Sequence, residues 1–236
     1  MRAVVQSTKA GSPRARAMRR EVDVATRERV LEAAVASILE RGFYRASSNE
    51  IARRAGVTWG VIQHHFGTRE ALLLAVLEDG ANRFVDLVAG AAIEGATATA
   101  RVDELLSLLA EHYGTPRYLA YLQILLNMDH DPHTSTDVRR TMRSVAERSN
   151  QHLRRLIGEA LDPVADDPDL AATVFLALRG FALSQQLRGT MSYDAVRSKK
   201  LSRVGEQRRL LSIMIGSYLD EAAGWPKRRH VSRHSR

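Results

Sequence analysis

Apolar residues recur at helical spacing through most of the chain, and no segment alternates apolar and polar residues long enough to suggest a sheet. The pattern predicts an all-α fold. The first strongly amphipathic segment is expected to begin after Thr26, a favourable N-cap residue, and to end at Gly42. Its apolar face consists of Val30, Leu31, Ala34, Val35, Ile38 and Leu39.

Two short helices separated by a glycine are predicted directly after this segment. Ser47 is a favourable N-cap residue, and Glu50 stands three positions later, where its side chain can complete a capping box. The helix that begins there should end at Ala55, because Gly56 is suited to a left-handed stop position. Two helices in this arrangement are either a helix-turn-helix that reads DNA or simply two packed helices.

The second short helix and its flanks favour the DNA-reading alternative. This helix is predicted from Trp59 to Phe66, with Thr58 as its N-cap and Gly67 after its end. A further helix follows, capped by Thr68. Residues 24–78 resemble the DNA-binding domain of the TetR family of transcriptional regulators, whose pattern is a helix, G-F/Y, I-A-x-x-A-G-V-S/T-x-G, H-x-F and a basic residue. The matching residues are Gly42, Phe43, Ile51, Ala52, Ala55, Gly56, Val57, Thr58, Gly60, His64, Phe66 and Arg69.

The resemblance implies that the second short helix enters the major groove of duplex DNA, with its N-terminal residues against base edges. Gln63 can pair with adenine, and Trp59 can contact a thymine methyl group. Hydroxyl groups at helix N-termini suit phosphate oxygens, although Ser47 and Thr58 could serve as caps alone. Arg69 matches the family's basic phosphate contact. The predicted DNA-binding residues are Ser47, Ser48, Thr58, Trp59, Gly60, Gln63, His64, His65 and Arg69.

Two departures from the family pattern leave the base preference open. Tyrosine is usual in the family where this chain has Gln63, and an aromatic residue is frequent where it has His65. His64 and His65 do not suggest a metal pair, because adjacent helical residues diverge by about 100° and do not easily face one ion. They are expected to touch DNA or the protein core.

The rest of the chain is predicted as helices over residues 69–89, 101–113, 116–128, 138–161, 168–185 and 205–221, with a loop or frayed end at 90–99. We therefore expect four parts: a basic disordered tail (1–23), a helix-turn-helix DNA-binding domain (24–69), a helical ligand-binding and dimerisation domain (70–222) and a basic C-terminal tail (223–236). The resemblance implies a homodimer joined by a four-helix bundle from helices within 170–221. The alternative is that their apolar faces fill the core of a single chain.

The resemblance also implies a small-molecule effector that enters a cavity among the middle helices and releases the operator. A pocket of this kind needs apolar and aromatic walls with a few polar anchors. The candidate lining residues are Tyr113, Tyr118, Tyr121, Leu122, Leu125, Met128, Phe175 and Arg179.

Composition narrows the class of protein further. The chain has no cysteine and none of the common catalytic motifs, so the sequence predicts neither an enzyme nor a metal or cofactor site. It has no apolar run of membrane-spanning length and no signal-peptide pattern, so we expect a soluble cytoplasmic protein that does not engage a membrane.

The net charge of +8 is concentrated at the two ends. Residues 1–29 hold eight Lys or Arg against three Asp or Glu, and residues 225–236 hold five against none, which leaves −2 for the middle. Arg14, Arg16, Arg19 and Arg20 adjoin the predicted DNA-binding domain, where they could contact phosphates or the minor groove; a solubilising arm is the alternative. The prediction is a homodimeric repressor that an effector releases from operator DNA. The alternatives are a transcriptional activator and a nonspecific DNA-binding protein with basic tails.

Overall fold

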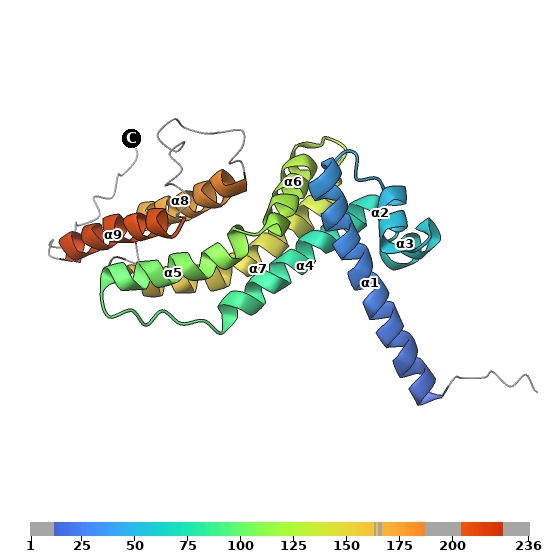
Figure 1. Cartoon of the computed structure of the whole chain (residues 1–236), viewed down its shortest axis with the longest axis horizontal. Coiled ribbons are helices and arrows are strands. Elements are labelled where there is room, and N and C mark those ends of the chain that lie inside the picture. The colour runs from blue at the N-terminus through green and yellow to red at the C-terminus, as the bar shows by residue number, and fades with distance from the viewer. Residues whose placement is uncertain (1–11, 163, 165–166, 187–203, 224–236) are drawn as a thin grey trace, which may run out of the picture. The chain divides into compact units, whose positions relative to one another are not determined.

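The computed structural model describes residues 12–162, 164, 167–186 and 204–223. Within these ranges the chain is helical and contains no strand, which confirms the predicted all-α class (Figure 1). The chain divides into two compact units, residues 1–76 and 77–236, and one helix, α4 (Arg69–Ala89), runs through the boundary. Residues 224–236, nearly all of the expected C-terminal tail, lie outside the described ranges.

The first unit contains α1 (Pro13–Arg41), α2 (Ser48–Ala55), α3 (Trp59–Phe66) and the beginning of α4. Each of the four helices contributes at least one large, fully buried aliphatic side chain to its core, including Ile38, Ile51, Ile62 and Leu72. The two glycines that follow α2 and α3 adopt positive φ, +66° at Gly56 and +79° at Gly67. Positive φ is disfavoured for residues with a Cβ, and these glycines therefore end both short helices at the predicted positions.

α1 begins at Pro13, so residues 13–23, which the sequence predicts as part of a disordered tail, are helical. Ser12 caps this helix by accepting a hydrogen bond from the backbone nitrogen of Ala15, and proline is well tolerated at the first helical position. Thr26 is consequently an internal residue, and its hydroxyl accepts a bond from Arg29 instead of capping a helix. Arginine and alanine, which favour helix, make up seven of the 13 residues from Pro13 to Ala25.

The second unit contains the rest of α4, then α5 (Ala98–Tyr113), α6 (Pro116–His130), α7 (Thr136–Leu161), α8 (Pro168–Gln186) and α9 (Val204–Ala223). α5 packs against α7, α8 and α9. Hydroxyl caps at Thr97, Thr115 and Ser135 begin α5, α6 and α7, and the Asp167 carboxylate caps α8. α5 and α7 begin three and two residues earlier than the periodicity suggested, because the capping residues lie upstream of the first apolar position.

α9 lies closely against the beginning of α5. A Cβ at Gly216 would lie 2.7 Å from the backbone nitrogen and Cα of Thr99, so only glycine fits there. Ser212 is buried and donates a hydrogen bond of 3.1 Å to the carboxylate of Asp103. The opposite side of α9 is apolar and exposed. We call it the α9 stripe; it consists of Leu210, Ile213, Met214 and Tyr218.

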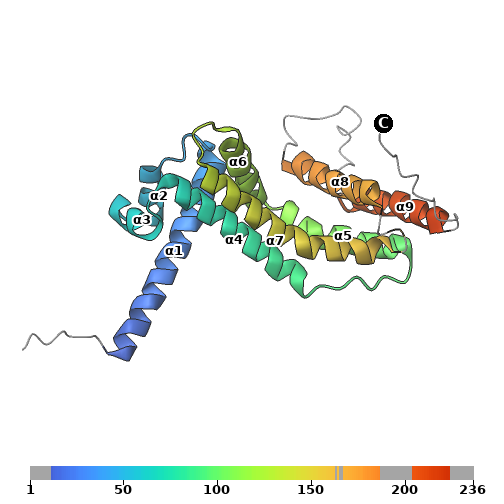
Figure 2. The ribbon, with the colours of Figure 1, turned by 180° about the vertical axis from the view of Figure 1, so that it is seen from behind.

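None of the helices in the described ranges combines the length and apolar character needed to cross a membrane. Figure 2 shows the same helices from behind.

Candidate nucleic-acid interface

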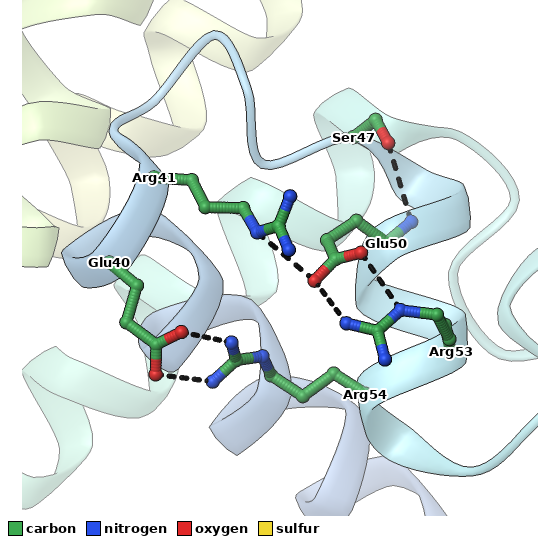
Figure 3. Close-up of polar contacts among 6 residues, drawn as sticks. All are labelled: Glu40, Arg41, Ser47, Glu50, Arg53 and Arg54. Atoms are coloured by element: carbon green, nitrogen blue, oxygen red, sulfur yellow. Dashed lines mark hydrogen bonds and ion pairs between the residues drawn. The ribbon is translucent and has the colours of Figure 1, made fainter.

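α2 is held against the end of α1 by arginine–carboxylate pairs (Figure 3). Glu50 Oε1 lies 3.2 Å from Arg41 Nε and 2.7 Å from Arg53 Nη2. Arg54 forms a two-pronged pair with Glu40. The hydrogen bond from Arg53 contributes most to lowering the pKa of Glu50, and the bond from Arg54 does the same for Glu40. These pairs orient α2 relative to α1, and thereby fix the position of the turn that leads into α3.

The predicted capping box forms only in part. Ser47 Oγ accepts a hydrogen bond of 3.3 Å from the backbone nitrogen of Glu50, as expected of an N-cap. The second bond of the box, from the backbone nitrogen of Ser47 to the Glu50 carboxylate, is replaced by other contacts. The Ser47 nitrogen donates to the carbonyl of Arg45 at 2.9 Å, and the Glu50 carboxylate pairs with Arg41 and Arg53. Ser48, the first residue of α2, is half-buried.

α3 is anchored by Ile62, which is fully buried, and presents its opposite face to solvent. Gly60, Gln63 and His64 are exposed, and Trp59 is half-buried. Residues three or four positions apart lie on the same side of a helix, and Trp59–Gln63, Gly60–His64 and Gly60–Gln63 have these spacings. These four predicted DNA contacts therefore occupy one broad side of α3. His65 points the other way: its side chain is only 10% exposed and its Nε2 lies 3.5 Å from Asp23 on α1. The structure therefore places His65 at the contact with α1, apart from the other four.

Thr58 precedes α3 in extended conformation, but its side chain makes no capping hydrogen bond. The residue is exposed. Its hydroxyl is thus available to an outside acceptor or donor, whereas the hydroxyl of Ser47 is already engaged as a cap.

Arg69 turns inward to the loop between α1 and α2. Its Nη2 donates to the carbonyl of Phe43 at 2.8 Å and, more weakly, to that of Ala46 at 3.4 Å. The guanidinium also lies 4.7 Å from the centroid of the Phe43 ring, in cation–π geometry. Burial lowers the pKa of Arg69 from its ordinary value, although a guanidinium remains charged at neutral pH. These contacts give Arg69 a part in holding the domain together, beside the phosphate contact that the sequence predicts.

In the second unit, three of the candidate ligand residues gather around a histidine. The His112 ring lies 5.1 Å from Tyr113, 5.5 Å from Tyr118 and 6.5 Å from Tyr121, measured between centroids. Phe84 on α4 completes the group at 4.7 Å from His112. We call these five residues the aromatic cluster. Sequence reasoning missed His112 and Phe84 as members; the available signal was a histidine placed on the apolar side of α5.

Burial changes the acid–base properties of the aromatic cluster. It lowers the pKa of His112 to about 4 and raises the pKa values of Tyr113, Tyr118 and Tyr121. His112 is therefore neutral near pH 7, and the three hydroxyl groups remain protonated donors. The cluster thus combines apolar ring faces with neutral polar groups.

The other candidate ligand residues lie on α6 and α8. Met128 is buried, whereas Leu122, Leu125 and Phe175 are half-buried. Arg179 lies over the Phe175 ring at 4.2 Å from its centroid, and a hydrogen bond with Arg179 acts on the pKa of Tyr118. Arg179 therefore connects α8 to the aromatic cluster.

Comparison with known proteins agrees with this geometry. Residues 30–76 match the family model described as bacterial regulatory proteins, tetR family. A relative, the HTH-type transcriptional regulator BetI of Rhizobium meliloti, is 28% identical over 69% of this chain and 78% of its own. Residues 30–76 therefore form a DNA-binding domain of the TetR type, and the chain is a DNA-binding transcriptional regulator.

Solved structures show the same fold. A TetR-family member from Streptomyces coelicolor aligns with a TM-score of 0.57 at 21% identity, over 80% of this chain and 97% of its own. The multidrug binding protein EbrR complexed with imidazole aligns with a TM-score of 0.53 at 21% identity, over 80% of this chain and 93% of its own.

Proposed function

We propose that the protein is a homodimeric repressor that binds operator DNA through α3 and leaves it when a small molecule binds the second unit. The observation that carries this proposal is the exposed face of α3, where Trp59, Gly60, Gln63 and His64 stand together opposite the buried Ile62. A recognition helix needs such a face, free of internal partners, to reach base edges in the major groove. Such a regulator would act in the cytoplasm, where chromosomal DNA is.

Phosphate contacts are proposed beside this face. Thr58 has an exposed hydroxyl without a capping bond, which suits it to a phosphate oxygen. We also propose that Ser47, Ser48 and Arg69 contact phosphates at the edge of the domain. Arg69 can contribute only through the N–H groups that are not already engaged by the carbonyls of Phe43 and Ala46.

The α9 stripe supports the homodimer. Its side chains are 45% to 62% exposed, whereas the other side of α9 is buried against α5. On α8, Leu176 is also 67% exposed. Large apolar side chains in a continuous stripe mark an interaction surface, and a second copy of the chain is the partner that two operator half-sites require.

The aromatic cluster supports a small-molecule effector. Ring faces with neutral hydroxyl and imidazole groups suit an organic ligand that combines apolar area with hydrogen-bonding atoms. The neighbour EbrR is described as a multidrug binding protein complexed with imidazole, which is consistent with effector binding in this fold. For regulation the ligand must favour the conformation that does not bind DNA, and a coupling of about 1–3 kcal/mol gives a change in affinity of about 5- to 150-fold.

Fluorescence anisotropy tests the DNA-binding part of the proposal. The purified chain is titrated into duplex DNA from upstream of its own gene and into a scrambled duplex, at several salt concentrations. The proposal predicts preference for the first duplex at physiological salt. Replacing Gln63 with Ala should relax the preference at one base position, while the same change at Gln151, exposed on α7, should leave it unchanged.

A nonspecific basic-tail binder would bind both duplexes equally, with affinity that falls steeply with salt. An activator would bind the operator as well, so a reporter fused to the operator and its promoter must show whether transcription falls or rises with the regulator. Repression that is relieved by a compound which also lowers affinity in the anisotropy assay would establish the full proposal.

Sedimentation analysis tests the dimer. Replacing Met214 with Glu, in the middle of the α9 stripe, should shift the protein toward monomer, because a buried unpaired carboxylate disfavours association. Leu126 on α6 is 58% exposed and serves as the control position for the same kind of substitution. Equal sedimentation of the wild-type protein and the Met214→Glu variant would refute the assignment of this surface.

A further inference from the structure

The N-terminal half of α1 has a composition and an exposure that folding does not explain. Every residue from Ser12 to Ala25 is exposed, although these residues form more than three turns of helix. A helix that buries no face gains nothing from packing in its own domain. Figures 1 and 2 show these turns (dark blue) extending beyond α2 and α3 of the same unit.

This exposed segment, residues 13–24, is basic. We call it the arginine arm, after Arg14, Arg16, Arg19 and Arg20. No ion pair or hydrogen bond engages these four side chains among the residues that the structure describes. The acidic residues of the arm are Glu21 and Asp23, and Asp23 faces His65 of α3. The arm therefore carries a net charge of +2, and its four cations are free of internal partners.

The arm adjoins the recognition helix. An open groove of about 510 Å³ lies between α1 and α3. One wall includes Arg19 and Arg29 of α1, and the other includes Thr58, Gly60 and His64, which are three of the predicted DNA contacts. Any duplex that docks on the exposed face of α3 must therefore pass beside the groove and the arm.

Two contacts hold the arm's base in place. Asp23 lies 3.5 Å from His65, and the guanidinium of Arg27 lies 5.5 Å from the centroid of the Phe66 ring. Both partners are at the C-terminal end of α3. α1 is thus fixed to the recognition helix at the point where the arm begins, and the direction of the arm is set by the same helix that reads the bases.

We propose that the arginine arm is a second DNA-contacting element, which follows the sugar–phosphate backbone of the duplex bound by α3. Apolar walls at Val22, Val57 and Val61 suit the sugars of one strand in the groove, and the arginines neutralise its phosphates. The arm's 12 residues span about 18 Å at 1.5 Å per residue. At 3.4 Å per base pair this equals about five base pairs next to each half-site. This inference rests on the proposed DNA-binding role of α3.

Salt-dependent binding tests the arm. The test variant replaces Arg14, Arg16, Arg19 and Arg20 with Gln, which has a similar helix propensity, so circular dichroism should stay unchanged. The control variant replaces four exposed arginines of α7 with Gln, which changes the net charge equally: Arg140, Arg143, Arg148 and Arg154. Each phosphate contact contributes about 0.9 to the slope of log affinity against log salt. Losing four therefore makes the slope shallower by about 3.6 for each protomer bound, or about 7 for a dimer on two half-sites.

We expect the arm variant to show this shallower slope on operator and scrambled DNA alike, because backbone contacts carry no base information. Hydroxyl-radical footprinting should lose protection of about five base pairs next to each half-site. The α7 variant should behave as the wild type. A slope and a footprint equal to those of the wild type, or an equal change in the α7 variant, would overturn the proposal.

Two further outcomes separate this proposal from others. If the wild-type protein showed no preference for the operator, the proposed function of α3 would be wrong. The arm proposal would then be tested by comparing the salt slopes of the wild type and the arm variant on nonspecific DNA. Vesicles with anionic lipid provide a competing polyanion surface. If the arm variant lost vesicle binding but kept the full salt slope on DNA, the arm would be a membrane-surface element and the DNA proposal would be wrong.

Discussion

Replacing Arg69 with Met separates the two roles that the sequence and the structure give to this residue. In the structure its guanidinium donates to the carbonyl of Phe43 at 2.8 Å and stacks on the Phe43 ring at 4.7 Å. Methionine keeps much of the side-chain length but removes the charge and all donors. The variant should therefore destabilise the DNA-binding domain even when no DNA is present.

The expected loss follows from these contacts. A hydrogen bond from a charged donor contributes about 1.5–3 kcal/mol. The cation–π contact of a half-buried guanidinium adds about 0.5–1 kcal/mol, and we count nothing for the bonds of 3.4 Å to Ala46 because of their length. The sum is a loss of about 2–4 kcal/mol in the free energy of unfolding. With a urea dependence of about 1–2 kcal/mol per molar, the midpoint should fall by about 2 M.

Tryptophan fluorescence can follow the unfolding of the DNA-binding domain alone. The chain has two tryptophans, and replacing Trp225 with Phe leaves Trp59 on α3 as the reporter. Urea unfolding of the full chain is then followed with and without the Arg69→Met change. Arg45 is exposed in the same loop, and Arg45→Met is the matched control, with the same charge change and little expected loss.

An unchanged urea midpoint in Arg69→Met would refute the structural role. If that variant nevertheless lost affinity for all DNA sequences equally and its salt slope fell by about 1, Arg69 would be a phosphate contact alone. Loss of both stability and salt slope would show that one guanidinium serves both purposes.

Three further predictions concern stability. Burial lowers the pKa of His112 from 6.5 to about 4, so between these pH values the folded state binds fewer protons than the unfolded state. The contribution of His112 to the free energy of unfolding is therefore complete above pH 6.5. It is lost as the pH falls toward 4, by at most about 3 kcal/mol. Thermal unfolding from pH 7.5 to 4.5 should show this decline, and the His112→Phe variant should decline less; parallel curves would contradict it. Gly56→Ala should cost about 1–2 kcal/mol, because φ is +66° there, whereas Gly90→Ala should cost little, since open space surrounds that position; equal urea midpoints would argue against the left-handed cap. Gly216→Ala should lower the free energy of unfolding by about 1–3 kcal/mol, because its Cβ would press on the backbone of Thr99. Gly205→Ala, at an open helical position, is the control.

The sequence predicts the helix-turn-helix well because its signals are local. The residues that begin and end α2 and α3 are determined by neighbours within four positions, through caps at Ser47 and glycines at 56 and 67. The beginning of α1 was missed for the opposite reason. Its first turns have no apolar face, and a search for apolar periodicity therefore starts the helix at Thr26, where burial begins.

Contacts between segments that are far apart in the chain could not be predicted from the sequence. Glu50 was expected to return to the Ser47 nitrogen, but Arg41 on α1 competes for the same carboxylate. Arg69 was predicted as a phosphate contact. Its bonds to the carbonyls of Phe43 and Ala46 could not be predicted, because these residues lie more than 20 positions earlier in the chain. The tyrosines of the aromatic cluster were predicted from their apolar helices, whereas Phe84 joins from α4 only through the tertiary fold.

The exposed α9 stripe has a consequence for how the amount of regulator relates to its effect. A chain that associates through this surface forms dimers in proportion to the square of its concentration when monomers predominate. Operator occupancy then rises more steeply than the number of chains produced. In the proposed homodimer, halving expression would therefore lower operator occupancy by more than half when occupancy is low. A substitution in the α9 stripe would have the same effect as a lower gene dosage, without altering any residue proposed to touch DNA.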